Sequence, residues 1–208
     1  MIVVDGVLAA SIGAALLLYR PPAAAAPPLA TPTVSVEGPD LSSEKPELQA
    51  VLNHSVAPDL PKYIAIPAIG VADVRIFSMG LLPNSTIKTP TNIYDAGWYE
   101  ASAKPGAAGV MFIFGHVSNM TNNGIFKDLK KITTGDTVVV TGGDNKTYRY
   151  TVTGRESSPV DQIAMQTILT PRAPGTSELA LMTCDGTYDP RTQTFSKRLV
   201  VFARLEQK

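Results

Sequence analysis

The feature that most constrains the fold is a succession of short apolar segments, separated by turn-forming residues, over residues 61–208. The 17 prolines and 16 glycines of the chain are unfavourable inside helices but common in turns. We expect strands in YIAIPAI (63–69) and VADVRIF (71–77), on either side of a turn at Gly70. The continuous apolar run AAGVMFIF (107–114) is consistent with a buried strand.

The second half of the chain continues this pattern. Residues 136–152 predict a β-hairpin that turns at Gly142–Asn145. ELALMTC (178–184) and KRLVVFARL (197–205) are expected to be the last two strands, and IFKDLKKI (125–132) a short helix. Many short strands with little helix predict a mainly β fold, a closed or nearly closed β-barrel.

The amino-terminal residues 2–19 are apolar except for Asp5. As a helix they would span roughly 27 Å, close to the thickness of a bilayer's hydrocarbon core. We therefore expect a transmembrane anchor over residues 1–20. A cleaved signal peptide is an alternative because small residues follow at 23–26, although no basic residue precedes the apolar run. A buried core helix is a third possible structure for residues 2–19.

Residues 21–60 are rich in proline and alanine towards their amino end and show no apolar periodicity. Such a composition predicts an extended, solvated linker. We accordingly divide the chain into an anchor (1–20), a linker (21–60) and a catalytic domain (61–208).

Charge and cysteine content exclude several function classes. Lys+Arg and Asp+Glu each number 18, and no basic run suggests a nucleic-acid partner. The single cysteine cannot form an intramolecular disulfide. One cysteine and two histidines do not make an ordinary zinc site, so we expect neither a metal nor a cofactor.

Two residues at expected strand ends have chemistry that could belong together. Cys184 closes an apolar strand and precedes a loop-like sequence, where a thiol can face a cleft. On its own it is more often a buried structural cysteine. His116 follows a buried strand and Gly115, and an imidazole can both give and accept a proton near neutral pH.

Arginine is the third element of this group. Arg198 opens the final strand, 14 residues after Cys184, and its fixed charge and forked donors suit a developing oxyanion. Arg191 in the intervening loop is a competing candidate. Arg204 has the same strand parity as Arg198 but lies roughly 20 Å further along the strand.

The segments LALMTCDGTYDPRTQTFSKRLVVFARL (179–205) and GWYEASAKPGAAGVMFIFGHVSNMTNNGIFKDLKKITTGDTVVV (97–140) resemble the sortases. In that family a Thr-Cys pair closes one strand and an Arg opens the next. The shared elements of the second segment are Gly-Trp-Tyr, Pro-Gly, Gly-His, a Phe-x-x-Leu helix and Gly-Asp before a strand. The Gly-Trp-Tyr block is most similar to the sortases of classes D to F.

The resemblance implies an eight-stranded barrel with short helices, and three catalytic roles. Cys184 would be the nucleophile that forms an acyl-thioester, His116 the proton donor and acceptor, and Arg198 the stabiliser of the oxyanion. Thr183 would position the thiol or contact substrate, or be simply a strand-favouring residue. Asn119 and Met120 depart from the acidic or basic residues that many members carry there. Loop 185–196 is expected to shape specificity.

The same resemblance implies the activity. Sortases cut a Leu-Pro-x-Thr-Gly-like sorting signal between Thr and Gly and join the Thr carbonyl to an amine. The expected partners are surface proteins that carry this signal, an acceptor amine of cell-wall peptide or pilin lysine, and the membrane that holds the extracytoplasmic domain. A hydrolytic cysteine endopeptidase and a non-enzymatic tethered β-domain remain alternatives.

Overall fold

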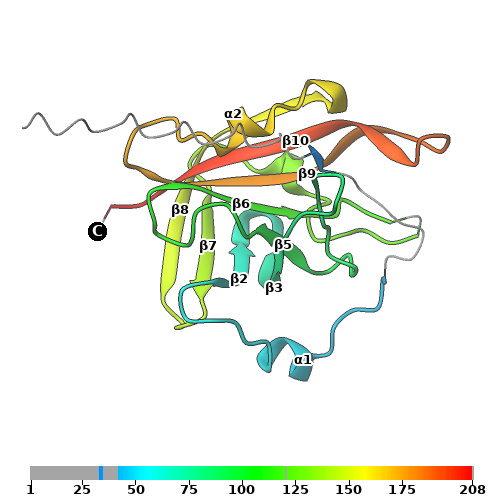
Figure 1. The fold of residues 1–208 in the computed structure, drawn as a ribbon. Coiled ribbons are helices and arrows are strands. Elements are labelled where there is room, and N and C mark those ends of the chain that lie inside the picture. Colours follow the sequence, from blue (N-terminus) through cyan, green and yellow to red (C-terminus); the bar gives the residue numbers. More distant parts are fainter. Residues whose placement is uncertain (1–32, 35–41, 120, 208) are drawn as a thin grey trace, which may run out of the picture.

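The structure, a computed structural model, describes residues 33–34, 42–119 and 121–207 (Figure 1). Eight strands close into a barrel in the order β10-β8-β7-β2-β3-β5-β6-β9, which confirms the predicted mainly β, closed barrel. The barrel strands are β2 (Pro61–Ile66), β3 (Val71–Met79), β5 (Ala96–Tyr99), β6 (Gly109–Gly115), β7 (Thr137–Gly142), β8 (Thr147–Pro159), β9 (Ser177–Asp189) and β10 (Thr194–Leu205).

Helices in the described residues are short and lie in the connections between strands. The strand pair β1 (Thr33–Val34) and β4 (Thr86–Ile87) forms a small parallel sheet apart from the barrel. The helices are α1 (Leu48–Leu52), α2 (Met165–Leu169) and the 3₁₀ turns η1 (Pro67–Ile69), η2 (Leu129–Lys131) and η3 (Val160–Gln162).

Side chains that point alternately to the two faces of each strand form two separate apolar clusters. The larger one receives residues from all eight barrel strands, among them Met111 and Ile113, and fills the barrel interior. The intervening residues of β6, such as Phe112 and Phe114, join an outer cluster that also contains Met165 of α2. Because β6 is covered on both faces, it is apolar at consecutive positions rather than at every second one.

The segment 125–132 is not the predicted helix but a set of turns that ends in the 3₁₀ turn η2. Phe126, Leu129 and Ile132 are all fully buried in the barrel interior. Their spacing of three residues matches the three residues per turn of a 3₁₀ helix, and the Leu129 N–H donates to the Phe126 carbonyl accordingly.

The last two strands are longer than expected. β9 was predicted to end at Cys184 and β10 to begin at 197, but the two strands remain paired as far as Asp189 and Thr194. The segment 185–196 is therefore mostly a β-hairpin rather than a loop. Only residues 190–193 form its turn.

Part of the predicted linker packs against the barrel. Ser42 bridges to Asn92, and the carbonyls of Pro58 and Leu60 accept backbone N–H groups from the β7–β8 turn. Residues of the segment 42–60 thus contact the folded domain, and the division expected at residue 61 stays a prediction. The predicted anchor (1–20) and linker residues 21–32 and 35–41 lie outside the described residues. No helix within the described ranges has the length and apolar character needed to cross a bilayer.

A buried ion pair joins β3 to the chain entering β5. The Nε and Nη2 atoms of Arg75 donate to the two carboxylate oxygens of Asp95 at 2.9 and 2.8 Å. Asp95 is buried, whereas the Arg149–Glu206 pair lies at the surface. The two ion pairs therefore differ in their exposure to solvent.

The substitution Asp95→Asn should lower the free energy of unfolding by about 2 kcal/mol, because the partly buried charge of Arg75 loses its counter-charge. Glu206→Gln is the matched control, and its exposed pair should contribute less than about 1 kcal/mol. Urea denaturation of both variants measures the difference. Equal effects of the two substitutions would show that the Arg75–Asp95 pair does not stabilise the junction of β3 and β5.

Candidate active site

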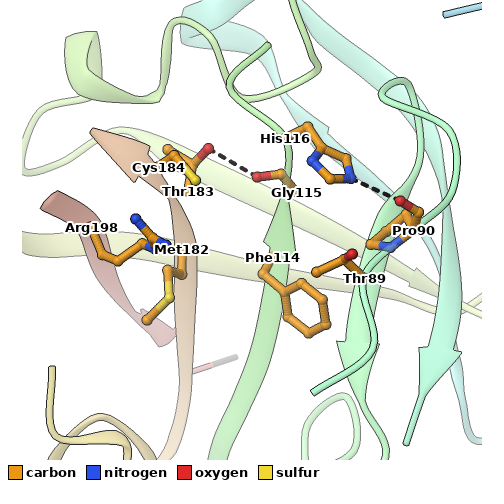
Figure 2. A pocket seen from close by; sticks show the side chains of 9 residues that line it. All are labelled: Thr89, Pro90, Phe114, Gly115, His116, Met182, Thr183, Cys184 and Arg198. Atoms are coloured by element: carbon orange, nitrogen blue, oxygen red, sulfur yellow. Dashed lines mark hydrogen bonds between the residues drawn. The ribbon is translucent and has the colours of Figure 1, made fainter. Parts of the chain in front are cut away.

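Parallel pairing of β6 and β9 brings two of the predicted site residues together. The register runs from Gly109 opposite Ser177 to Phe114 opposite Met182, so the residues that follow on each strand meet at one edge. The Thr183 hydroxyl donates to the Gly115 carbonyl at 2.9 Å and joins the two strands at this point. His116 and Cys184 come directly after these joined residues (Figure 2).

Antiparallel pairing of β9 and β10 adds the third residue. Arg198 and Cys184 are direct partners across the two strands, and directly opposed residues present their side chains on the same face. Cys184 therefore lies between the strand carrying Arg198 and the one leading to His116. The three side chains line one pocket, whose other lining residues are Thr89, Pro90, Phe114, Gly115, Met182 and Thr183.

The pocket lies on the outer face of the barrel. Phe114 and Met182 belong to the outer cluster, and Cys184 follows Met182 with the same strand parity. Thr183 has the opposite parity and its hydroxyl is engaged by the Gly115 carbonyl. Its role in the structure is to hold β6 against β9, and its expected contact with substrate stays a prediction.

The His116 ring is oriented by the backbone. Its Nε2 lies 2.8 Å from the Pro90 carbonyl oxygen, which can only accept a hydrogen bond, so Nε2 carries a proton. Nδ1 is left as the nitrogen that can exchange a proton with a reacting group. Burial lowers the pKa of His116 below its ordinary value, and the bond to Pro90 offsets part of that effect.

The thiol of Cys184 is also buried, with 6% of the residue exposed. Burial raises the pKa of Cys184, and the positive charge of Arg198 opposes that rise. A lowered pKa of His116 and a raised pKa of Cys184 both favour the neutral forms, a thiol and an unprotonated imidazole. The ion pair of thiolate and imidazolium is then a minor form at neutral pH.

Arg198 is the arginine that the fold brings to the pocket. Its Nη1 donates to the carbonyls of Phe195 and Lys197 at 3.0 and 2.9 Å, and its Nη2 to Thr194 Oγ1 at 3.0 Å. The competing candidate Arg191 has a 90% exposed side chain that pairs with Asp189.

Arg204 pairs with Glu178 at 3.8 Å, near the start of β9. It does not line the pocket, which agrees with the expectation that one cleft does not use both Arg198 and Arg204.

Sequence reasoning missed Thr89 and Pro90, which form the wall opposite β9 (Figure 2). Pro90 acts through its carbonyl, which any residue has, and it lies 26 positions before His116. No local pattern could have revealed this contact. Of the two residues that depart from the family pattern, Asn119 accepts backbone N–H groups within its own turn, and Met120 lies outside the described residues.

Comparison with known proteins identifies the family of the chain. The sequence model described as the sortase domain matches residues 64–206, more than half of the chain. No curated protein matches the sequence.

Three solved structures with the same fold are described as sortases. Sortase C2 of pilus island 1 from group B Streptococcus has a TM-score of 0.55 and 21% identity, covering 85% of this chain and 88% of its own. A sortase D5 transpeptidase from Clostridium perfringens has a TM-score of 0.53 and 21% identity, covering 76% and 86%. The sortase SrtA from Actinomyces oris has a TM-score of 0.53 and 21% identity, covering 73% and 83%. At this identity the likeness concerns the fold, and the assignment to classes D to F stays a prediction.

The resting protonation state can be tested through the rate at which iodoacetamide alkylates Cys184, since only the thiolate reacts. Because burial raises the pKa of Cys184, the rate should climb with pH and reach its midpoint above about 8.5, the ordinary value for cysteine. His116→Gln should shift that midpoint little, because the resting imidazole is neutral. A midpoint below pH 7 that rises in His116→Gln would instead reveal a resting thiolate–imidazolium pair.

Proposed function

The chain belongs to the sortase family of cysteine transpeptidases, and on that premise we propose that it cleaves a Leu-Pro-x-Thr-Gly-like sorting signal and joins the Thr carbonyl to an amine. The observation that carries this proposal is the meeting of Cys184, His116 and Arg198 in one pocket from three neighbouring strands. A nucleophile, a proton carrier and a fixed positive charge are the groups that acyl transfer through a thioester needs.

The first half-reaction forms the acyl-enzyme. The Cys184 thiol passes its proton to Nδ1 of His116, and the thiolate sulfur attacks the Thr carbonyl carbon. Arg198 stabilises the oxyanion of the tetrahedral intermediate. As the Thr–Gly bond breaks, His116 gives its proton to the departing Gly amine, which leaves a thioester on Cys184.

The second half-reaction transfers the acyl group. His116, neutral again, accepts a proton from the incoming amine as its nitrogen attacks the thioester carbonyl. The new amide bond forms, and the sulfur leaves and recovers its proton from His116. If water takes the place of the amine, the same steps give hydrolysis.

The pocket walls are suited to an apolar, proline-containing peptide. Phe114 and Met182 continue the outer apolar cluster up to Cys184, and Pro90 lies across from them. None of the pocket-lining residues is acidic, so the charge of Arg198 remains available to a carbonyl oxygen. The protonated resting thiol also suits an extracytoplasmic enzyme, because oxidation proceeds through the thiolate.

The cellular setting of the proposal comes from the amino-terminal sequence. An apolar run at 2–19 followed by a proline-rich segment fits a single-pass membrane anchor that holds the domain outside the cytoplasm. The partners are then surface proteins that carry the sorting signal, and the acceptor is a cell-wall peptide or a pilin lysine. One similar structure is named as a sortase of a pilus island, which is compatible with the second acceptor.

Mass spectrometry of the protein incubated with a library of sorting-signal peptides tests the nucleophile. The wild type should carry a thioester on Cys184, and Cys184→Ala should form neither acyl-enzyme nor product. Adding triglycine should give a ligated peptide. Cleavage without any ligated product would support the hydrolytic endopeptidase, and function that survives alkylation of the thiol would support a non-enzymatic domain.

The two arginines of the hairpin offer a matched comparison. Arg198→Ala should lower kcat/KM for the sorting peptide by about 100-fold or more, the usual effect of removing one oxyanion donor. Arg198→Lys keeps the charge but loses the fork, so a large loss is expected here too. Arg191→Ala should stay within about twofold of wild type because its side chain is exposed. A larger loss in Arg191→Ala than in Arg198→Ala would overturn the assignment of the oxyanion residue.

A further inference from the structure

The hairpin beyond Cys184 bends around the side chain of Arg198. Its register shifts so that Gly186 and Thr187 lie opposite the single residue Ser196, which is a β-bulge. Gly186 has a φ of 79°, and a Cβ there would come within 2.4 Å of Ser196 Oγ. The Thr187 N–H donates to that same oxygen at 3.0 Å. Figure 1 shows the paired ends of β9 and β10 projecting past the barrel.

This bend lets residues near the hairpin turn contact a side chain four positions away. In a regular strand, residues 194 and 198 would be roughly 13 Å apart. The Arg198 side chain extends back along β10 instead, and its guanidinium reaches the carbonyls of Phe195 and Lys197 and the hydroxyl of Thr194. Thr194 supplies the one side-chain acceptor among these three.

The donors of Arg198 divide into an occupied and an unoccupied set. A guanidinium has five N–H bonds, and three of them are used on the hairpin. Nε is buried and has no hydrogen-bond partner in the described part of the protein. The open donors are therefore Nε–H, which is buried, and the second proton of Nη2.

A second arginine of the protein shows what an arginine Nε–H can bind. Arg75 uses its Nε and Nη2 to hold the two oxygens of the Asp95 carboxylate. In Arg198 the Nε–H has no acidic partner, because none of the described salt bridges involves this residue. A buried donor without a partner is unfavourable, so an oxygen that enters the pocket would satisfy it.

We infer that Thr194 is a positioning residue for acyl transfer, because it holds the Arg198 guanidinium through Nη2 and so presents the unpaired Nε–H to the substrate oxygen beside Cys184. The inference rests on the proposed function for the identity of that oxygen. Donors that are already oriented need no reorganisation when charge develops, which is why their orientation matters more than their charge alone. Thr194 itself does not touch the reacting atoms.

The test compares the isosteric Thr194→Val, which removes the acceptor, with Thr194→Ser, which keeps it. Thr194→Val should lower kcat/KM for the sorting peptide about tenfold, mainly through kcat, because one hydrogen bond to a charged group is lost. Thr194→Ser should restore most of the activity. Thr187→Val is the matched control, since Thr187 is exposed on the same hairpin and bonds Ser196 through its backbone N–H. It should behave as wild type.

A second measurement needs no substrate. The charge of Arg198 holds down the pKa of Cys184, so a displaced guanidinium in Thr194→Val should move the pH midpoint of iodoacetamide alkylation upward. Thr194→Ser and Thr187→Val should leave the midpoint in place. If this shift appears although the wild type processes no sorting peptide, the positioning role stands and the proposed function fails. If Thr194→Val matches Thr187→Val in both measurements, Thr194 does not position Arg198.

Discussion

The site depends on the pairing of β9 with two neighbours of opposite direction. Parallel pairing with β6 places His116 beside Cys184, and antiparallel pairing with β10 places Arg198 opposite it. The bond from Thr183 to the Gly115 carbonyl joins β6 and β9 at the point where the site begins. A slip of one residue in either pairing would turn the affected side chains to the other face of the sheet, so the register of three strands is itself a requirement for the chemistry.

The environment of the three residues explains how a reactive group can stay unreactive until it is needed. Burial disfavours the charged forms of both Cys184 and His116. The positively charged Arg198 donates three hydrogen bonds to the β9–β10 hairpin. The positive charge is thus fixed in place, while in the proposed mechanism the negative charge appears only during the reaction. Such an arrangement favours the transition state over the resting state.

The strand pattern and the three site residues could be predicted because they depend on local signals. The hairpin at Gly142–Asn145, the buried strand before His116 and the parity of β9 and β10 follow from turn chemistry and alternation. The η2 turn could not be predicted, because it depends on how Phe126, Leu129 and Ile132 fit the barrel interior. The length of the last hairpin could not be predicted either, because it depends on a bulge at Gly186. The contact of His116 with Pro90 could not be predicted from the sequence, because it uses the backbone carbonyl, which every residue has.

Closure of the barrel has a consequence for how a peptide can be recognised. Within the closed part of the barrel no strand has a free edge, so an extended segment cannot bind there by adding a further strand. Recognition then has to come from side chains and connecting segments on the outer face. The sequence of those segments can change without disturbing the hydrogen bonds of the barrel. Peptide specificity can therefore change without a loss of barrel stability.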